Sequence, residues 1–277
     1  MNAISFIFFS SLITSQISRA QENPVGTSTA QISPLTAGPK KALSASAYLE
    51  YSEKIAKEQF GPKKRSTAIQ VNLGYEWNEF LKSNSELTVN KDQFGQQETT
   101  VSDMKISTSI NGYAISDTIN TKHSISTVVP MSKNSVKRDR LQTSISLANG
   151  VKYINNYFSI GYTLSVAQNF HEFTQNAEGS PNIQNRLTQS VDLAVPITEK
   201  ISVSTSGAYR IGRTYQNSTR YGFIFDLDAN YEIVKSLDLN IGTSNEGNAL
   251  KKNGIDSNIS IYDENSSVSR AGLTYSY

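Results

Sequence analysis

Residues 158–170, FSIGYTLSVAQNF, decide the fold class of this chain of 277 residues. The large apolar residues of this stretch share even positions: Phe158, Ile160, Tyr162, Leu164, Val166 and Phe170. Serine, glycine, threonine, alanine and asparagine fill the odd positions between them. A period of two with one apolar and one polar face predicts a β-strand.

The same alternation recurs along the chain and predicts twelve strands, an even number. Their apolar stripes cover residues 43–51, 69–77, 87–89, 104–110, 119–129, 141–147, 158–170, 187–195, 201–211, 221–231, 237–241 and 271–277. Most stripes are close in length to the ~9–11 residues that a tilted strand needs to cross a bilayer.

The connections between these strands alternate in length. Short turns are expected near residues 79–83, 116–117, 151–155, 198–200 and 234–235. Longer polar loops are expected at residues 54–64, 91–100, 132–138, 171–184, 213–218 and 247–267. Short turns at one end and long loops at the other predict an all-β fold, a closed antiparallel up-and-down transmembrane β-barrel of about 12 strands.

A soluble β-sandwich is the competing interpretation of alternating strands. Its polar face would be rich in Lys and Glu, whereas here that face is mainly Ser, Thr, Asn, Gly and Gln, as in a lumen wall. Aromatic residues also gather where stripes end, as expected for two interfacial girdles. They are Trp77, Phe80, Tyr113, Tyr153, Tyr157 and Tyr231 near the short turns, and Tyr51, Phe170, Tyr209 and Tyr221 near the long loops.

Composition excludes several classes of protein. The absence of Cys rules out disulfides, zinc–thiolate sites and cysteine nucleophiles. The balance of 26 Lys plus Arg against 24 Asp plus Glu gives no broad basic field, so no nucleic acid is expected as a partner. Residues 1–20 predict a signal peptide that ends in Ser18, Arg19 and Ala20, although no Lys or Arg precedes its apolar stretch. Residues 21–41 predict a flexible periplasmic leader, and residues 42–277 the barrel.

The C-terminus carries the sharpest single motif, AGLTYSY at residues 271–277. Leu273, Tyr275 and Tyr277 occupy the fifth-last, third-last and last positions. This pattern resembles the C-terminal signal of Gram-negative outer-membrane β-barrels, which their assembly machinery reads. The resemblance covers the predicted barrel, matches no single family, and implies an outer-membrane location in contact with lipid and lipopolysaccharide.

Catalytic and metal-binding groups are sparse. His123 lies on the apolar face of its strand. Some twelve-stranded outer-membrane phospholipases carry a catalytic His on this face with a Ser two residues further along on the same face. That position is Ile125, and Ser124 points the other way, so no activated nucleophile is expected. The acidic pair Asp226 and Asp228 lacks the ligand density of a calcium loop. We therefore expect no enzymatic activity, no metal and no cofactor.

The charged residues on the polar face of the strands are more informative. If the first strand runs outward, five arginines ring the outer half of the wall: Arg140, Arg186, Arg210, Arg220 and Arg270. Acids lie lower on the same parity: Glu76, Asp192, Asp226, Asp228 and Asp238. Two interpretations remain open, an anion path or mutual neutralisation across the wall.

Twelve strands ~4.8 Å apart and tilted ~40° give a backbone diameter of roughly 24 Å and a lumen on the order of 10 Å. Small side chains on the polar parity favour open space there. The sequence therefore predicts a porin-like diffusion channel for small hydrophilic, anionic solutes. The alternative is a structural or surface-interaction barrel with a closed or plugged lumen and functional outer loops.

Overall fold

The computed structural model describes residues 43–55, 64–93, 97–251, 253–264 and 266–277. The predicted signal peptide and leader lie outside these residues. The described part contains thirteen strands and one π-helical turn, η2 (Asn134–Arg138). The strands are β1 (Leu43–Lys54), β2 (Arg65–Glu76), β3 (Leu81–Asp92), β4 (Thr99–Val101), β5 (Met104–Ser116), β6 (Ile119–Val129), β7 (Leu141–Ile154), β8 (Ser159–His171), β9 (Ile183–Pro196), β10 (Ile201–Thr214), β11 (Thr219–Val234), β12 (Leu237–Asn248) and β13 (Val268–Ser276).

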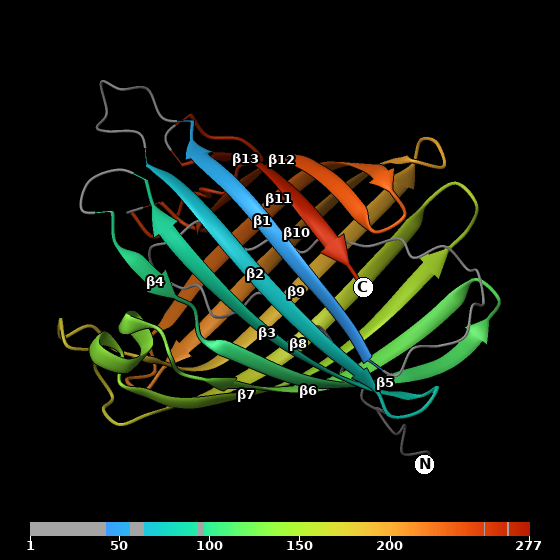
Figure 1. Cartoon of the computed structure of the whole chain (residues 1–277). Coiled ribbons are helices and arrows are strands. Elements are labelled where there is room, and N and C mark those ends of the chain that lie inside the picture. Colours follow the sequence, from blue (N-terminus) through green and yellow to red (C-terminus); the bar gives the residue numbers. More distant parts are fainter. Residues whose placement is uncertain (1–42, 56–63, 94–96, 252, 265) are drawn as a thin grey trace, which may run out of the picture.

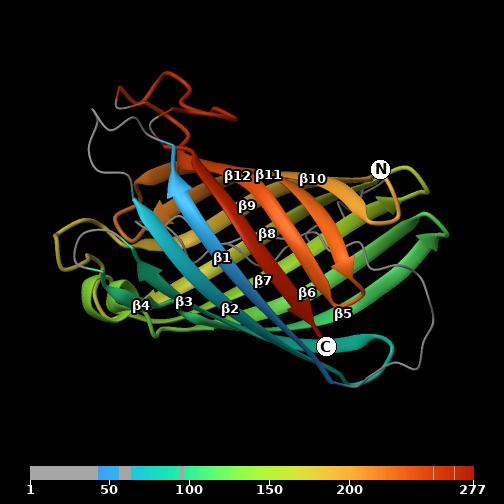
Figure 2. The ribbon, with the colours of Figure 1, turned by 45° about the horizontal axis from the view of Figure 1, so that its top comes forward.

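Twelve of these strands form one closed antiparallel barrel, as predicted (Figure 1). Each strand pairs with its neighbour in sequence, and β1 pairs with β13 to close the ring. The thirteenth strand, β4, is a three-residue addition that pairs with the outer end of β3. Figure 2 shows the tilt of the strands around the ring. No helix among the described residues is long and apolar enough to cross a membrane.

The wall has its apolar face outside and its polar face inside. Leu73 is 50 % exposed on the outer surface, whereas Asp228 is 3 % exposed on the inner one. A soluble β-sandwich would show the opposite distribution, with its apolar face buried. The alternation therefore provides a lipid-facing band and a polar lumen, which is the arrangement of a membrane barrel.

Three local predictions need correction. The third strand has 12 residues and not only the short stripe at 87–89. Its first half was missed because Ser83 and Ser85, which are polar, occupy positions that face outward. The expected turn at 151–155 lies at 155–158, because β7 continues to Ile154. The connection expected to be long at 213–218 is a tight turn of residues 215–218, where Thr214 N–H donates to the Ser218 carbonyl at 2.9 Å.

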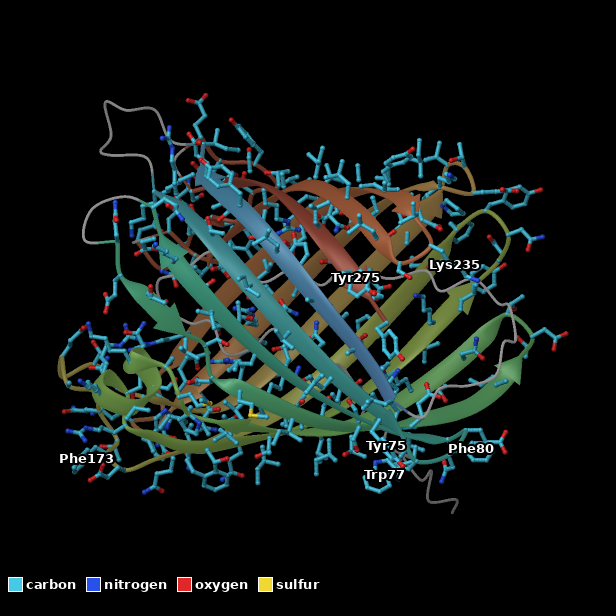
Figure 3. All side chains as sticks on the ribbon, viewed as in Figure 1. Tyr75, Trp77, Phe80, Phe173, Lys235 and Tyr275 are labelled. Atoms are coloured by element: carbon cyan, nitrogen blue, oxygen red, sulfur yellow. The ribbon has the colours of Figure 1, made fainter. Side chains whose placement is uncertain are left out.

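Aromatic side chains occupy both rims. Tyr75 and Trp77 stack edge to face with 4.8 Å between ring centroids, and Figure 3 places them with Phe80 at the β2–β3 turn. At the long-loop end, Tyr209 and Tyr221 stack with centroids 6.3 Å apart. The side chain of Tyr113 lies outside the described ones. Rings at these two levels suit the two membrane interfaces.

The C-terminal residues complete the seam of the barrel. Leu273 and Tyr275 belong to β13, where they face outward with Tyr277, which follows the strand. The Tyr277 N–H donates to the Ala45 carbonyl at 2.8 Å. Nine register pairs between β1 and β13, from Ser46↔Ser276 to Lys54↔Val268, close the rest of the seam.

Deleting Tyr277 is expected to reduce the amount of barrel inserted in cells while leaving refolding in detergent nearly unchanged. The deletion removes the terminal ring of the predicted assembly signal but leaves the nine β1–β13 register pairs in place. Heat-dependent gel mobility measures the folded fraction in both settings. Tyr277→Phe keeps the ring and is the matched control. Equal insertion of the deletion variant and the full chain would contradict an assembly role.

Candidate functional site in the barrel lumen

The inner wall is lined mainly by short side chains. In the middle of β6, β7 and β8, lumen positions such as Ser124, Ser126, Ser144 and Ser165 are buried against neighbouring strands. Ser126 and Ser146 hydrogen-bond to each other across β6 and β7 at 2.6 Å. Against this neutral background, the charged side chains of the wall determine its chemistry.

Arg270 is bound by two carboxylates inside the wall. Its Nη1 donates to Asp226 Oδ1 at 2.8 Å, and its Nη2 donates to Asp228 Oδ2 at 2.7 Å. Its Nε also donates to Asp228 Oδ1 at 3.1 Å. All three side chains are almost fully buried. Arg270 and its acids therefore lie at the same depth, unlike the expected separation of arginines above and acids below.

A glycine makes this cluster possible. The register aligns Asp228 of β11, Gly242 of β12 and Arg270 of β13 in one row. A Cβ added to Gly242 would overlap the Asp228 carboxylate, so the missing side chain provides the path along which Asp228 reaches Arg270. Neighbouring strands thus supply the charges, and the strand between them supplies the space.

Arg186, Arg210 and Arg220 form a second group on three adjacent strands, β9, β10 and β11. Gly212 is the register partner of both Arg186 and Arg220, and Arg210 lies two residues away from Gly212 on β10. Arg186 and Arg210 are close enough for their charges to interact. Arg220 is exposed as the second residue of β11.

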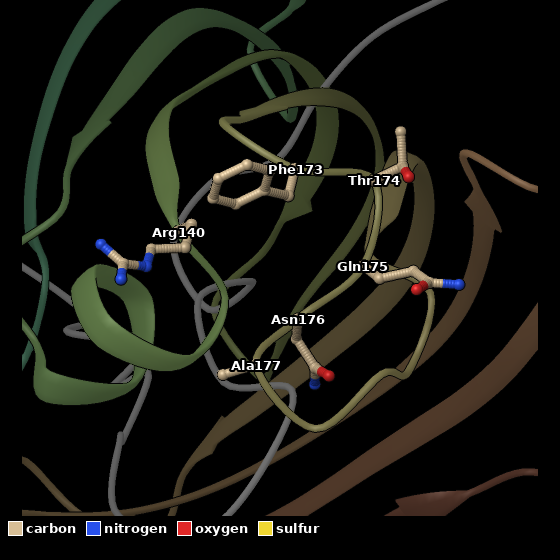
Figure 4. Close-up of a pocket in the computed structure, with 6 residues that line it drawn as sticks. All are labelled: Arg140, Phe173, Thr174, Gln175, Asn176 and Ala177. Carbon is tan, nitrogen blue, oxygen red and sulfur yellow. The ribbon is translucent and has the colours of Figure 1, made fainter.

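Arg140 lies on the rim, one residue before β7. Its φ of 52° is in the left-handed region, and its carbonyl accepts the Glu172 N–H at 2.9 Å. Its exposed side chain lines a small pocket together with Phe173, Thr174, Gln175, Asn176 and Ala177 of the β8–β9 loop (Figure 4). The structure thus associates Arg140 with an outer loop.

The remaining predicted acids have separate surroundings. Glu76 accepts from Lys82 Nζ at 3.5 Å across β2 and β3. The Asp192 carboxylate lies over Gly161, where an added Cβ would overlap it. Asp238 is the register partner of Glu232, so two acids adjoin near the short-turn end of β11 and β12. Of the five predicted acids, all within the described part of the chain, Asp226 and Asp228 are the two that share one ion-paired cluster, because both bind Arg270.

Sequence reasoning missed a set of lysines on β5, β6 and β7. Lys105, Lys122 and Lys152 occupy the polar parity of β5, β6 and β7, and Lys122 lies within electrostatic range of Lys82 and Lys152. Glu86 is the register partner of Lys105. The sequence pattern could have revealed these lysines, because they alternate with small polar-face residues in the same way as the arginines do.

The two histidines occupy different surfaces. His123 is exposed on the outer face, where its Nδ1 and Asn149 Oδ1 are 2.6 Å apart. Ile125 occupies the next outward position, as the sequence indicated. His171 ends β8 and packs edge to face on Tyr215, with 5.7 Å between ring centroids. No group of three or more potential metal ligands occurs among the described residues.

Comparisons with known proteins identify the architecture. No protein-family model matches the sequence, and no curated protein matches it significantly. An outer-membrane channel from Pseudomonas putida F1 is similar in structure, with a TM-score of 0.59, 10 % identity and coverage of 89 % of this chain and 100 % of that chain. The NanC porin is similar with a TM-score of 0.56, 9 % identity and coverage of 83 % and 98 %.

The KdgM porin in complex with disordered oligogalacturonate has a TM-score of 0.50, 7 % identity and coverage of 83 % and 99 %. At these identities the likeness concerns the fold. In barrels of this type the long loops are extracellular and the short turns periplasmic. The chain has the fold of the bacterial outer-membrane β-barrels.

Proposed function

We propose that the protein is an outer-membrane diffusion channel for small hydrophilic, anionic solutes. The observation that carries this proposal is the presence of basic side chains on opposite sides of the lumen. Lys105 projects from β5 and Arg220 from β11, and each is the second residue from the long-loop end of its strand. In the closed ring of twelve strands, β5 is six strands from β11 in either direction.

Two basic walls facing one lumen would concentrate anions between them. Clefts lined by one sign of charge within a low-dielectric wall focus the electric field and raise the local concentration of counter-ions. Small serine and glycine positions between the charges favour space for a hydrated solute. The similarity in fold to known channels and porins supports the same function.

The proposal excludes Arg270 from the solute path. Its guanidinium is already bound to Asp226 and Asp228, so neutralisation within the wall accounts for it. Arg140, on the outer rim, would meet solutes before they enter. Transport along the lumen then involves Arg186, Arg210 and Arg220 together with the lysines, and it requires no covalent chemistry.

Planar-bilayer recording tests the proposal directly. The refolded full chain is expected to produce discrete conductance steps and, under a potassium chloride gradient, a reversal potential of the sign that anion selectivity gives. Cation selectivity would contradict the anionic solute class. Absence of conductance from barrels that show folded gel mobility would contradict channel function altogether.

A second function, surface interaction, is favoured by the hydrogen bonds that hold the β8–β9 loop in place. The β8–β9 loop is fastened to η2 and its flanking residues: Ala177 N–H donates to the Arg138 carbonyl at 2.7 Å, and Asn182 Nδ2 to the Asp139 carbonyl at 3.0 Å. Such a fixed loop surface suits recognition of a partner. This function would be preferred if folded barrels conduct no ions.

A further inference from the structure

The described part of the β12–β13 loop, which we call the lateral loop (residues 249–251, 253–264 and 266–267), folds against the outside of the barrel. Asn245 lies on the outward parity of β12, as Ile241 does. Its Nδ2 donates to the Ser260 carbonyl at 2.7 Å, and Ser266 Oγ donates to its Oδ1 at 2.8 Å. Asn245 is therefore only 2 % exposed, whereas Ile241 is 56 % exposed.

The neighbouring strand is also shielded on its outer face at this level. Phe223 of β11 has the outward parity of Leu227, yet it is buried, whereas Leu227 is exposed. Its register partner is Gly247, two residues beyond Asn245 on β12. Figure 2 shows the lateral loop standing out to the side of the barrel at the long-loop end. The loop thus occupies the outer surface of the wall next to the lipid-facing band.

The lateral loop exposes large apolar side chains. Ile255 is 82 % exposed, and Ile259, Ile261 and Tyr262 are each more than half exposed. Single exposed apolar residues are ordinary, but four within eight positions form a patch of the kind that marks an interaction surface. The β8–β9 loop, in contrast, exposes only Phe173 among its described large hydrophobic residues.

The local structure places Ile255 on a short hairpin, and the other three side chains follow it in the chain. Lys251 N–H donates to the Asp256 carbonyl at 2.9 Å, and Leu250 forms an isolated bridge with Ser257. Asn258 N–H then donates to the Ala249 carbonyl at 2.8 Å. Ile255 is at the tip of this hairpin, and the exposed cation Lys251 is near its base.

We propose that the lateral loop docks onto the outer leaflet, with its apolar residues at the boundary between headgroups and acyl chains. The patch continues the lipid-facing band, since the loop rests on the outward face of β12 through Asn245. Tyr262 has the amphipathic ring that prefers such boundaries, and Lys251 is placed to meet lipid phosphate. The proposal is independent of channel function, because a closed barrel would dock in the same way.

Fluorescence quenching in vesicles tests this docking. The chain contains one tryptophan, so Tyr262→Trp in a Trp77→Phe background gives a single reporter on the loop. The full chain is reconstituted into phosphatidylcholine vesicles whose acyl chains carry bromine near the headgroups. A side chain ~5–10 Å into the boundary is expected to lose about half its emission to the brominated lipid and to be shielded from aqueous iodide.

Gln175→Trp in the same background is the matched control, because Gln175 is exposed on the β8–β9 loop. Its reporter is expected to be quenched by iodide and not by brominated lipid. The same iodide-only pattern at position 262 would overturn the proposal. Shielding from both quenchers, with a dimer mass by light scattering that Ile261→Ser abolishes, would overturn it in favour of a second copy of the chain.

Discussion

Arg270→Met is expected to lower the free energy of unfolding of the barrel by about 3 kcal/mol, because removing one partner of a buried ion pair leaves uncompensated buried charge. Here the change leaves two carboxylates, Asp226 and Asp228, without the guanidinium that binds both. The loss is measured as a shift of the unfolding midpoint in urea, followed by heat-dependent gel mobility of the reconstituted protein.

Two controls separate this charge effect from a general packing effect. Arg213→Met removes an exposed arginine from the outward parity of β10 and is expected to leave the midpoint almost unchanged. Adding Asp226→Asn and Asp228→Asn to Arg270→Met is expected to restore much of the lost stability, since amides need no counter-charge. If Arg270→Met and Arg213→Met have equal midpoints, the buried cluster does not stabilise the wall.

Replacing Arg186, Arg210 and Arg220 together by Ser is expected to lower the anion-to-cation permeability ratio roughly tenfold, because three positive charges leave one side of the lumen. Reversal potentials in planar bilayers measure the ratio. The change should shrink as salt rises, since the Debye length falls from ~10 Å at 0.1 M to ~3 Å at 1 M. An unchanged reversal potential in a conducting barrel would contradict the anion path.

The matched control replaces three exposed cations outside the lumen wall, Lys137, Arg213 and Lys235, by Ser. It removes the same net charge but is expected to leave selectivity almost unchanged, since exposed charges are screened by solvent and salt. If the lumen arginines serve only to neutralise acids, their replacement would instead lower the unfolding midpoint and leave selectivity unaltered. Measuring both properties on the same variants distinguishes the two roles.

Local sequence was sufficient for the number of strands in the barrel and for the face to which their side chains point. In a strand, successive side chains alternate between the two faces, so Ile160 and Tyr162 are placed outside and Gly161 inside by their spacing alone. The same rule placed His123 on the outer surface. Loop lengths were less predictable, because the tight turn after Thr214 depends on a bond to Ser218 that no pattern of hydropathy encodes.

Only the tertiary structure decided which charges meet and where the outer loops lie. Parity puts Arg270 and Asp228 on the same face, but their contact requires the register of three strands and the missing side chain at Gly242. Closure of the ring sets β5 opposite β11 and so brings Lys105 and Arg220 to facing walls at the long-loop end. These relations join residues far apart in the chain. Alternation is a property of adjacent residues, whereas register and closure are properties of the whole barrel.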